Sequence, residues 1–309
     1  MPAAKPPAER LSRRLWRATF DPLTRFRAGD DFRAYADFRF AHGRFPNNPP
    51  RTFTDHVFRL KVSDELESPL RVRISDKEFV KDYVREKLGD DFNVPVLAVL
   101  RTREEARRYG YPAPCVIKPT HASAQVIFRH GENDPVDLDR IESWFSLDKY
   151  RASRERNYRD LVPKVIVEKT ITHQGRLADD YKVYCFRGRP KFIGVIIDRR
   201  NTNKENSTYT LDWKRLPFRI NGTHGRDIER PARLDDLLRA ASALSADISF
   251  ARVDFYWDGT RFALGEITNL PASGHMRFFP LEADALAGRL FAEPDLDPES
   301  LFAPLGPIR

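Results

Sequence analysis

The chain has 309 residues, 41% of them hydrophobic and 32% charged, which is enough to bury a substantial core in one large or two modest domains. The formal net charge of +8 favours an anionic partner, and because no nucleic-acid-binding signature occurs, nucleic acid is the least favoured of these. No apolar run spans a membrane, no signal-peptide core occurs and only two cysteines, Cys115 and Cys185, are present, so a cytoplasmic protein is expected.

The first 75 residues are predicted to form a basic, helical N-terminal extension. Residues 10–28 mix arginines with apolar residues at helical spacing, and a basic amphipathic helix of this kind can bind an anionic membrane surface. The alternative is a solvated arm, or a segment packed on its own domain. A second helix is expected over residues 29–45, and a further helix begins near Thr52, after a proline-rich break.

The next helix carries the first candidate for anion binding. Ser75 and Glu78 have the spacing of a capping box, which predicts a helix from there to Leu88 with Lys77 in its first turn. The helix dipole disfavours a cation at that end, and a bound phosphate would reverse this penalty. An exposed helix lysine is the other interpretation. Beyond this helix, the pattern predicts strands at residues 94–100, 115–118, 126–128 and 162–168, with helices at residues 102–109 and 137–160.

Two features around Lys118 indicate a phosphate site. Lys118 closes an apolar strand, where a buried ammonium needs an anion, although a lysine can also extend from an edge strand to water. The residues that follow are small, and such a loop can bring backbone N–H groups close to phosphate oxygens, as glycine-rich loops do. The loop consists of Thr120, His121, Ala122, Ser123 and Ala124.

The second half of the chain is predicted to be rich in strands. A hairpin is expected over residues 180–198, followed by a polar, loop-like stretch at residues 199–230 and a helix at residues 233–244. The tail from Pro294 is expected to be irregular, because it is rich in proline.

Between that helix and the tail, two apolar strands joined by an Asp-Gly turn each carry one acid, Asp254 and Glu266. A two-residue turn would pair Asp254 with Ala263 and direct Glu266 to the opposite face. A three-residue loop would pair Asp254 with Leu264. Arg252 would then lie opposite Glu266, and all three polar side chains would share one face. Two carboxylates beside an arginine would suit Mg²⁺ bound with a nucleotide, whereas the alternative is a surface hairpin with an Arg–Glu pair.

Five motifs follow one another along the chain: ISDKEFVKDYV, IKPTHASA, DYKVYCFRGRPK, RVDFYW and GEITNLPASG. In this order and spacing they resemble the ATP-grasp superfamily, and most closely its TupA-like (teichuronopeptide biosynthesis) family. The likeness covers about residues 45–290 and implies an α+β ATP-grasp fold, in which two lobes clasp a nucleotide. The lobes would span residues 76–170 and 171–290, after the N-terminal extension (residues 1–75) and before a C-terminal tail at residues 291–309.

The resemblance implies a nucleotide site built from both lobes. In the family, the residue matching Lys118 contacts the α- and β-phosphates, and the residue matching Lys77 also binds nucleotide. Asp180 falls where these enzymes place a ribose-binding acid, with Asp179 as the rival position. The other residues implied in nucleotide binding are His121 and Ser123 in the small loop, Glu168, Lys169 and Ile171 at an adenine-binding hinge, and Lys182 on the hairpin over the phosphates.

The same resemblance implies a metal site and an acceptor site. Asp254 and Glu266 would bind Mg²⁺, with Thr268 at the position where ATP-grasp proteins commonly have an asparagine ligand. The implied catalytic residues are Arg252, which would stabilise an acyl-phosphate, and Ser273 and His275, which would line the acceptor pocket.

One motif departs from the family pattern. The small loop has Ala122 and Ala124 where the family has glycine, so its geometry is expected to differ.

The implied function is an ATP- and Mg²⁺-dependent carboxylate–amine ligase that attaches an amino acid to an acidic sugar of a cell-surface polysaccharide. Its partners would be a small-molecule or glycan acceptor and an amine donor, and it would act in the cytoplasm, at the inner face of the membrane if residues 10–28 bind there. Two alternatives stay open. One is a kinase that only phosphorylates its acceptor, and the other is a non-catalytic, basic glycan- or lipid-binding module, which the alanine-substituted loop favours.

Overall fold

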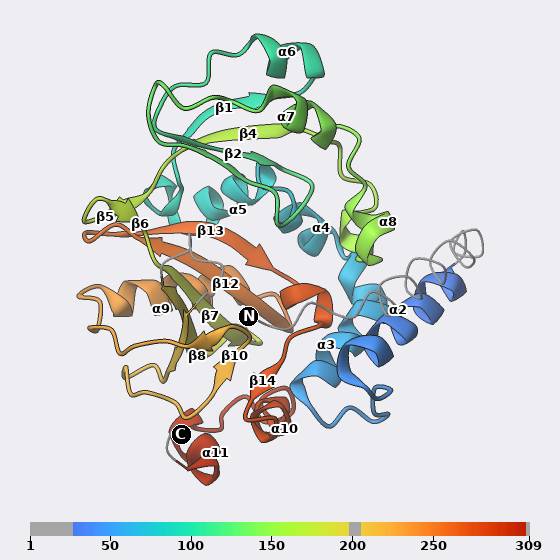
Figure 1. Cartoon of the computed structure of the whole chain (residues 1–309). Helices are drawn as coiled ribbons and strands as arrows, with labels where there is room; N and C mark the ends of the chain where they lie inside the picture. The colour runs from blue at the N-terminus through green and yellow to red at the C-terminus, as the bar shows by residue number, and fades with distance from the viewer. Residues whose placement is uncertain (1–26, 198–204, 307–309) are drawn as a thin grey trace.

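The computed structural model describes residues 27–197 and 205–306, and two β-sheets organise this part of the chain. In Figure 1 the four-stranded sheet lies above the six-stranded sheet. The four-stranded sheet has the order β1-β4-β2-β3, and every neighbouring pair is antiparallel. Its strands are β1 (Val96–Leu100), β4 (Val165–Lys169), β2 (Cys115–Pro119) and β3 (Ile127–Arg129).

The six-stranded sheet has the order β11-β9-β8-β7-β12-β13, with a parallel pair only between β11 and β9. Two further pairs, β5 with β6 and β10 with β14, form small sheets of their own. The remaining strands are β5 (Thr172–His173), β6 (Arg176–Leu177), β7 (Asp180–Phe186), β8 (Arg189–Ile197), β9 (Glu205–Tyr209), β10 (Arg219–Ile220), β11 (Thr223–His224), β12 (Phe250–Trp257), β13 (Phe262–Thr268) and β14 (Phe278–Phe279).

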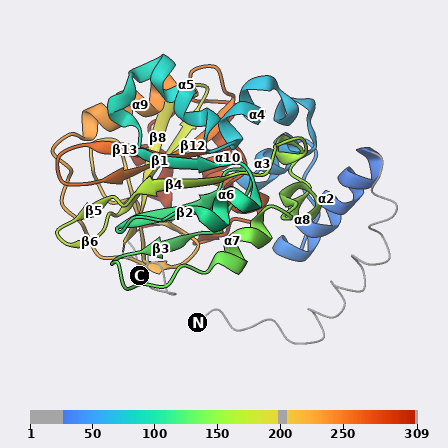
Figure 2. The same ribbon diagram turned by 90° about the horizontal axis from the view of Figure 1, so that it is seen from above.

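Helices cover the outer faces of both sheets. Viewed from above, α2, α3 and α8 gather at one side of the stacked sheets (Figure 2). The helices are α2 (Arg27–His42), α3 (Phe53–Val62), α4 (Pro69–Ser75), α5 (Phe79–Leu88), α6 (Arg103–Arg108), α7 (Leu138–Trp144), α8 (Lys149–Ser153), α9 (Leu234–Ser245), α10 (Glu282–Arg289) and α11 (Pro298–Phe302), with short 3-10 turns η2 (Asp64–Glu67), η3 (Asp90–Phe92), η4 (Arg156–Tyr158), η5 (Pro271–Gly274) and η6 (Ala303–Leu305).

The four-stranded sheet buries one face and keeps the other for polar side chains. Ile117 on β2 and Val167 on β4 pack with Ile141 and Trp144 of α7 in one hydrophobic cluster. Because side chains alternate along a strand, Lys118 and Glu168 on the same strands point to the opposite face. That face is directed at the six-stranded sheet.

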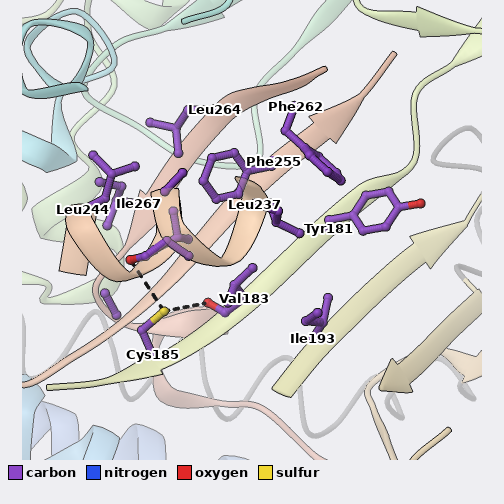
Figure 3. Close-up of a cluster of buried hydrophobic side chains, with 14 of the residues drawn as sticks. Tyr181, Val183, Cys185, Ile193, Leu237, Leu244, Phe255, Phe262, Leu264 and Ile267 are labelled. Atoms are coloured by element: carbon purple, nitrogen blue, oxygen red, sulfur yellow. Dashed lines mark hydrogen bonds between the residues drawn. The ribbon is translucent and has the colours of Figure 1, made fainter. Parts of the chain in front are cut away.

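The six-stranded sheet packs one face against α9. Val183 and Cys185 of β7 join Phe255 of β12 and Leu244 of α9 in a large buried cluster (Figure 3). The Cys185 thiol lies 3.8 Å from the carbonyl oxygens of Val183 and Ala241, so this cysteine is a packed core residue, as expected from its strand.

The opposite face of this sheet is divided along its length. At one end Tyr184 and Phe186 of β7 pack with Phe53 of α3 and with α10 and α11. At the other end the alternate residues Asp180 and Lys182 of the same strand face the first sheet. The strand order therefore brings polar faces of both sheets together.

Several local predictions were wrong. Ser75 does not start a helix; it ends α4, and its hydroxyl donates to the Arg71 carbonyl oxygen. Asp76 instead accepts from the backbone N–H of Glu78, so α5 begins at Phe79 and Lys77 precedes it.

The stretch predicted as a loop at residues 199–230 contains β9, β10 and β11. The tail predicted to be irregular contains α11, whose Leu301 and Phe302 are buried, because two apolar residues after Pro298 close the core beside β8.

Some predictions lie outside the part that the structure describes. The amphipathic segment at residues 10–28 is described only from Arg27, where α2 begins. None of the helices in residues 27–197 and 205–306 is both long and apolar enough to cross a membrane. The division of the chain at residues 75, 170 and 290 stays a prediction.

Candidate active site

The hairpin β12–β13 positions two acids side by side. Asp254 pairs directly with Glu266, and Arg252 pairs with Thr268. Both registers expected from the sequence were therefore wrong. The connection is longer than either, because Trp257 pairs with Phe262 and the loop between them is closed by hydrogen bonds to the Asp258 carboxylate.

The hairpin contains a β-bulge next to the acid pair, opposite Asp254 and Phe255. Leu264 and Ile267 both lie in the core cluster, although they are three residues apart and would face opposite sides of a regular strand. The extra residue is Gly265, where a Cβ would come within 2.8 Å of the Tyr256 ring. A side chain at this position would have to displace the end of the Tyr256 side chain, and the extra residue lets Glu266 face the polar side while Leu264 and Ile267 both face the core.

The polar residues of the six-stranded sheet form an acidic wall. Asp254 is 1% exposed, and Arg252 donates to both of its carboxylate oxygens, with Nε–Oδ1 and Nη2–Oδ2 distances of 2.7 and 2.6 Å. The Lys182 ammonium lies between two acids, 2.6 Å from Oδ2 of Asp180 and 2.6 Å from Oδ2 of Asp254.

Glu266 is held less tightly than Asp254. Its Oε1 accepts from the Thr268 hydroxyl at 3.1 Å and lies 3.5 Å from Arg252 Nη2, and its side chain is 40% exposed. Burial opposes ionisation of this carboxyl, but the charges of Lys77, Arg252 and Lys182 outweigh burial and hold its pKa at about 2. Glu266 therefore offers an ionised and accessible carboxylate as a ligand.

The polar face of the four-stranded sheet forms a basic wall around one acid. Glu168 lies between two lysines, with Lys118 Nζ 2.5 Å from Oε2 and Lys81 Nζ 2.6 Å from Oε1. Burial again opposes ionisation, and the two ammonium groups hold the pKa of Glu168 at about 2. Glu168 was expected to bind adenine, but both of its oxygens are held by these lysines.

Lys77 connects the basic wall to the small loop. Its backbone N–H donates to the Thr120 carbonyl oxygen at 3.1 Å, and its ammonium donates to the carbonyl oxygen of Ala122. The pKa of Lys77 is lowered to about 8; burial is the largest cause, Glu266 opposes it and Lys118 acts in the same direction as burial. A phosphate beside this group would favour its charged form.

One residue of the small loop adopts a backbone conformation that favours glycine. Ala124 has φ of 63°, in the left-handed region that alanine rarely adopts, whereas Ala122 is fully buried and has no positive φ. The His121 ring is turned away, with Nε2 3.1 Å from the Trp144 carbonyl oxygen, and burial lowers its pKa. His121 thus braces the loop on α7.

A cavity of about 370 Å³ separates the two walls, a size within the range of small-molecule sites. Of the predicted site residues, ten line it. They are Lys77, Lys118, Ser123, Glu168, Lys169, Ile171, Asp180, Lys182, Asp254 and Glu266. Asp180, rather than its rival Asp179, is the acid on the lining.

Two predicted residues lie directly behind this lining. Arg252 and Thr268 are not among the residues that line the cavity, but both hydrogen-bond to the acids that do. They can therefore fix the orientation of Asp254 and Glu266.

Three predicted residues are not brought to the cavity: His121, Ser273 and His275. The Ser273 hydroxyl donates to Glu155 Oε1 at 2.7 Å, and its carbonyl oxygen accepts from Lys61 at 3.1 Å. Since Glu155 belongs to the segment before β4 and Lys61 to α3, Ser273 joins three parts of the chain. The ring of His275 lies 6.5 Å from that of His42 on α2.

Sequence reasoning missed Lys81. Its ammonium also donates to the Val94 carbonyl oxygen at 3.1 Å. Lys81 therefore links α5 to the segment just before β1 as well as to Glu168. Its spacing of four residues from Lys77 was the available signal, because the helix predicted from the sequence would place both lysines on one face.

The acid pair fits a divalent cation that arrives with a phosphate. Among the residues described, no group of three or more His, Cys, Asp or Glu side chains could hold a metal ion. Asp254 and Glu266 supply two carboxylates, and Mg²⁺ is commonly bound by one or two carboxylates together with substrate phosphates. The donor set therefore suits Mg²⁺ in company with a polyphosphate.

Comparison with solved structures finds ATP-grasp ligases. An L-amino acid ligase from Bacillus licheniformis matches with 15% identity and a TM-score of 0.46, covering 82% of this chain and 57% of that one. The D-alanine–D-alanine ligase from Helicobacter pylori matches with 16% identity and a TM-score of 0.42, covering 74% and 60%. The ATP-grasp ligase PsnB, complexed with a minimal precursor, matches with 14% identity and a TM-score of 0.39, covering 66% and 55%. The chain thus spans a little over half the length of these structures, and the likeness at these scores carries no argument about activity.

The family assignment rests on the sequence. No curated protein matches the chain. A family model described as TupA-like ATP-grasp matches residues 59–292, most of the chain, and it confirms both the predicted family and the predicted α+β ATP-grasp fold. The chain belongs to the TupA-like ATP-grasp family.

Proposed function

We propose that this protein is an ATP-dependent carboxylate–amine ligase that binds ATP between its two sheets. One observation carries the proposal: the basic wall around Lys118 and the acidic wall around Asp254 face one another across a single cavity. A nucleotide triphosphate is complementary to both walls, because its phosphates need cations and its metal needs carboxylates.

The nucleotide would lie along the cavity with its base near the β4 end. Lys118 and Lys77 would contact phosphate oxygens, and the backbone of Ser123 and Ala124 would approach them from the small loop. Asp180 would accept from the ribose. The base would lie beside Lys169 to Ile171, where apolar side chains complete the lining: Val94, Val116, Phe128, Ile171 and Leu177.

Mg²⁺ would be held by Asp254 and Glu266, with the Thr268 hydroxyl orienting Glu266. When bound, the metal neutralises negative charge that develops on the transferred phosphoryl group. Arg252 holds Asp254 through two hydrogen bonds and lies within reach of Glu266, so it fixes the geometry of both acids.

The proposed reaction has two steps. A substrate carboxylate oxygen attacks the γ-phosphorus of ATP, the bond to the β-phosphate oxygen breaks, and an acyl-phosphate and ADP result. An amine then attacks the acyl carbon, loses a proton, and expels phosphate to give an amide. Lys77 and Lys118 would stabilise the charge that collects on ADP in the first step.

We propose, from the family, that the carboxylate belongs to an acidic sugar unit and the amine to an amino acid. The positive formal charge of +8 suits an acidic acceptor. Cytoplasmic action, and contact of residues 10–28 with an anionic membrane, belong to the same proposal.

The test is release of ADP from ATP and Mg²⁺ with glucuronic acid, with and without a panel of amino acids. Amide product should form in step with ADP when both substrates are present, and Glu266→Gln should form neither. A stable phosphorylated sugar that forms at the same rate with every amine, or with none, would replace the ligase with a kinase. No ATP binding at all would favour a non-catalytic module.

A further inference from the structure

Lys182 occupies an unusual position for a residue expected to bind phosphate. Its ammonium lies 2.6 Å from both Asp180 Oδ2 and Asp254 Oδ2, on the acidic wall rather than the basic one. Its side chain is 14% exposed. Each contact joins an ammonium to a carboxylate, so both favour the charged form of the lysine.

The oxygens of Asp254 already have cationic partners. Oδ1 accepts from Arg252 Nε, and Oδ2 accepts from both Arg252 Nη2 and Lys182 Nζ. A directly bound Mg²⁺ must approach a ligand oxygen to about 2.1 Å, closer than either nitrogen. Asp254 Oδ1 accepts only one hydrogen bond and keeps a further acceptor site, but a metal bound there would lie beside two positive charges, so its binding is disfavoured while Lys182 and Arg252 both stay in place.

Of these two cations, Lys182 is the one that can leave. Arg252 is fixed by its fork of two bonds to Asp254 and by a third bond, at 3.1 Å, to the Thr268 hydroxyl. Lys182 is a point charge on a flexible stem, without a fork that fixes its direction. It also lines the cavity, so an anion in the cavity can reach it.

We propose that Lys182 acts as a built-in counter-cation. It keeps the acid pair Asp254 and Glu266 from binding a divalent metal until a polyphosphate binds in the cavity and the lysine pairs with phosphate instead of with Asp254. Metal would then bind only together with nucleotide. This inference rests on the proposed function, since it assumes that ATP and Mg²⁺ share the cavity.

The charge balance favours this coupling. The lining residues are balanced, with Lys77, Lys118, Lys169 and Lys182 against Glu168, Asp180, Asp254 and Glu266, and two further cations, Lys81 and Arg252, are bonded to the lining acids from behind. Cations exceed anions, so a free divalent cation is repelled, whereas the complex of a metal with ATP carries net negative charge and is attracted.

The test measures metal binding without turnover. Mn²⁺ suits carboxylate ligands, and its free and bound forms can be counted by electron paramagnetic resonance. Wild-type protein should bind Mn²⁺ only when a non-hydrolysable ATP analogue is present. Lys182→Met should bind Mn²⁺ at least about tenfold more tightly than the wild type in the absence of nucleotide, because affinity rises with the net negative charge of the ligands.

Two controls separate this effect from a general loss of positive charge. Lys182→Arg keeps the cation and should bind no Mn²⁺ alone. Lys81→Met removes an equally buried lysine whose acid partner is Glu168 rather than Asp254, and it should also bind none.

Two results would overturn the inference: wild-type protein that binds Mn²⁺ equally well with and without the analogue, or folded Lys182→Met protein that gains no Mn²⁺ site. If Lys182→Met does not fold, Lys182→Gln, which also removes the charge, replaces it in the same measurement. Failure of the analogue itself to bind would count against the proposed function, while the measurements without nucleotide would still decide the role of Lys182.

Discussion

The two walls of the cavity solve the same electrostatic problem in opposite ways. On the basic wall, a single carboxylate, Glu168, is held by Lys81 and Lys118. On the acidic wall, a single lysine, Lys182, is held by Asp180 and Asp254. Each wall thus carries its own counter-charge, so Glu168 and Lys182 are both paired, whereas a buried charge left unpaired would cost several kcal/mol. What differs is the ligand for which each wall is suited, phosphate on one side and metal on the other.

The acidic wall should show the largest effects, and its two proposed metal ligands, Asp254 and Glu266, should differ from one another. Asp254→Asn and Glu266→Gln should each remove nearly all ATP-dependent turnover, because each replaces an anionic metal ligand with a neutral one. Asp254→Asn should also lower the free energy of unfolding by about 3 kcal/mol, since it leaves Lys182 and Arg252 without their shared acid.

For Glu266→Gln, whose side chain is 40% exposed, the loss of stability should stay below about 1 kcal/mol. Steady-state turnover and urea unfolding of both variants would measure this contrast. Wild-type turnover in both would place the metal elsewhere, and equal destabilisation would contradict the difference in burial. Glu282→Gln, on the exposed start of α10, is the control for loss of one acid.

On the basic wall, substitutions of the two lysines that hold Glu168 should differ in their effect on ATP affinity. Lys118 lines the cavity and Lys81 does not. Lys118→Ala should weaken ATP binding by about 1.5–3 kcal/mol, the range for a hydrogen bond to a charged group. Lys81→Met should change ATP affinity less, because its contacts are Glu168 and the Val94 carbonyl oxygen.

Calorimetric titration with ATP would measure both variants. Unchanged ATP affinity in Lys118→Ala would remove this residue from the nucleotide site. An equal loss in both variants would mean that Lys118 acts only through the Glu168 cluster.

The sequence predicted the chemistry of the two walls better than their local geometry. The sequence placed Lys118 at the end of an apolar strand, and the turn after Trp257 placed both acids on one hairpin, as the structure has them. The register of that hairpin could not be predicted, because it depends on a bulge at Gly265, and neither turn length considered from the sequence includes one. Likewise, nothing in the spacing of Ser273 shows that it is hydrogen-bonded to Glu155, since that contact arises from tertiary packing.

Lys77 gives a pH-dependent comparison between ATP binding and stability. Its pKa is about 8, against an ordinary value of 10.5. Burial is the largest cause of this lowering and Lys118 adds to it, while the acids Glu266, Asp76 and Glu168 oppose it. Between about pH 8 and 10.5 the folded protein releases this proton while the unfolded chain keeps it. The free energy of unfolding contributed by Lys77 should therefore rise through this window. ATP affinity should fall in the same window, since the neutral amine no longer attracts phosphate.

The matched variant for this test is Lys77→Met, which has no proton to lose. The difference in ATP affinity between wild-type and variant protein, followed by titration from pH 7 to 10, should shrink as pH rises. A difference that stays constant over this range would mean that Lys77 does not titrate in the site. A difference that grows would reverse the sign derived from burial.

The smallest expected effect concerns backbone strain, which the two walls handle differently. The acidic wall places its irregularity at Gly265, whereas the basic wall places a left-handed residue at Ala124, with φ of 63°. An alanine in that region costs about 1 kcal/mol, and a glycine there costs some unfolded-state entropy instead. Ala124→Gly should therefore raise the free energy of unfolding by a few tenths of a kcal/mol, up to about 1.

Ala122→Gly in the same loop is the control, because Ala122 is fully buried without a positive φ, and the substitution should lower stability through lost packing. Urea unfolding of both variants gives the comparison. A loss of stability in Ala124→Gly as large as that in Ala122→Gly would show that the loop is not strained at this position.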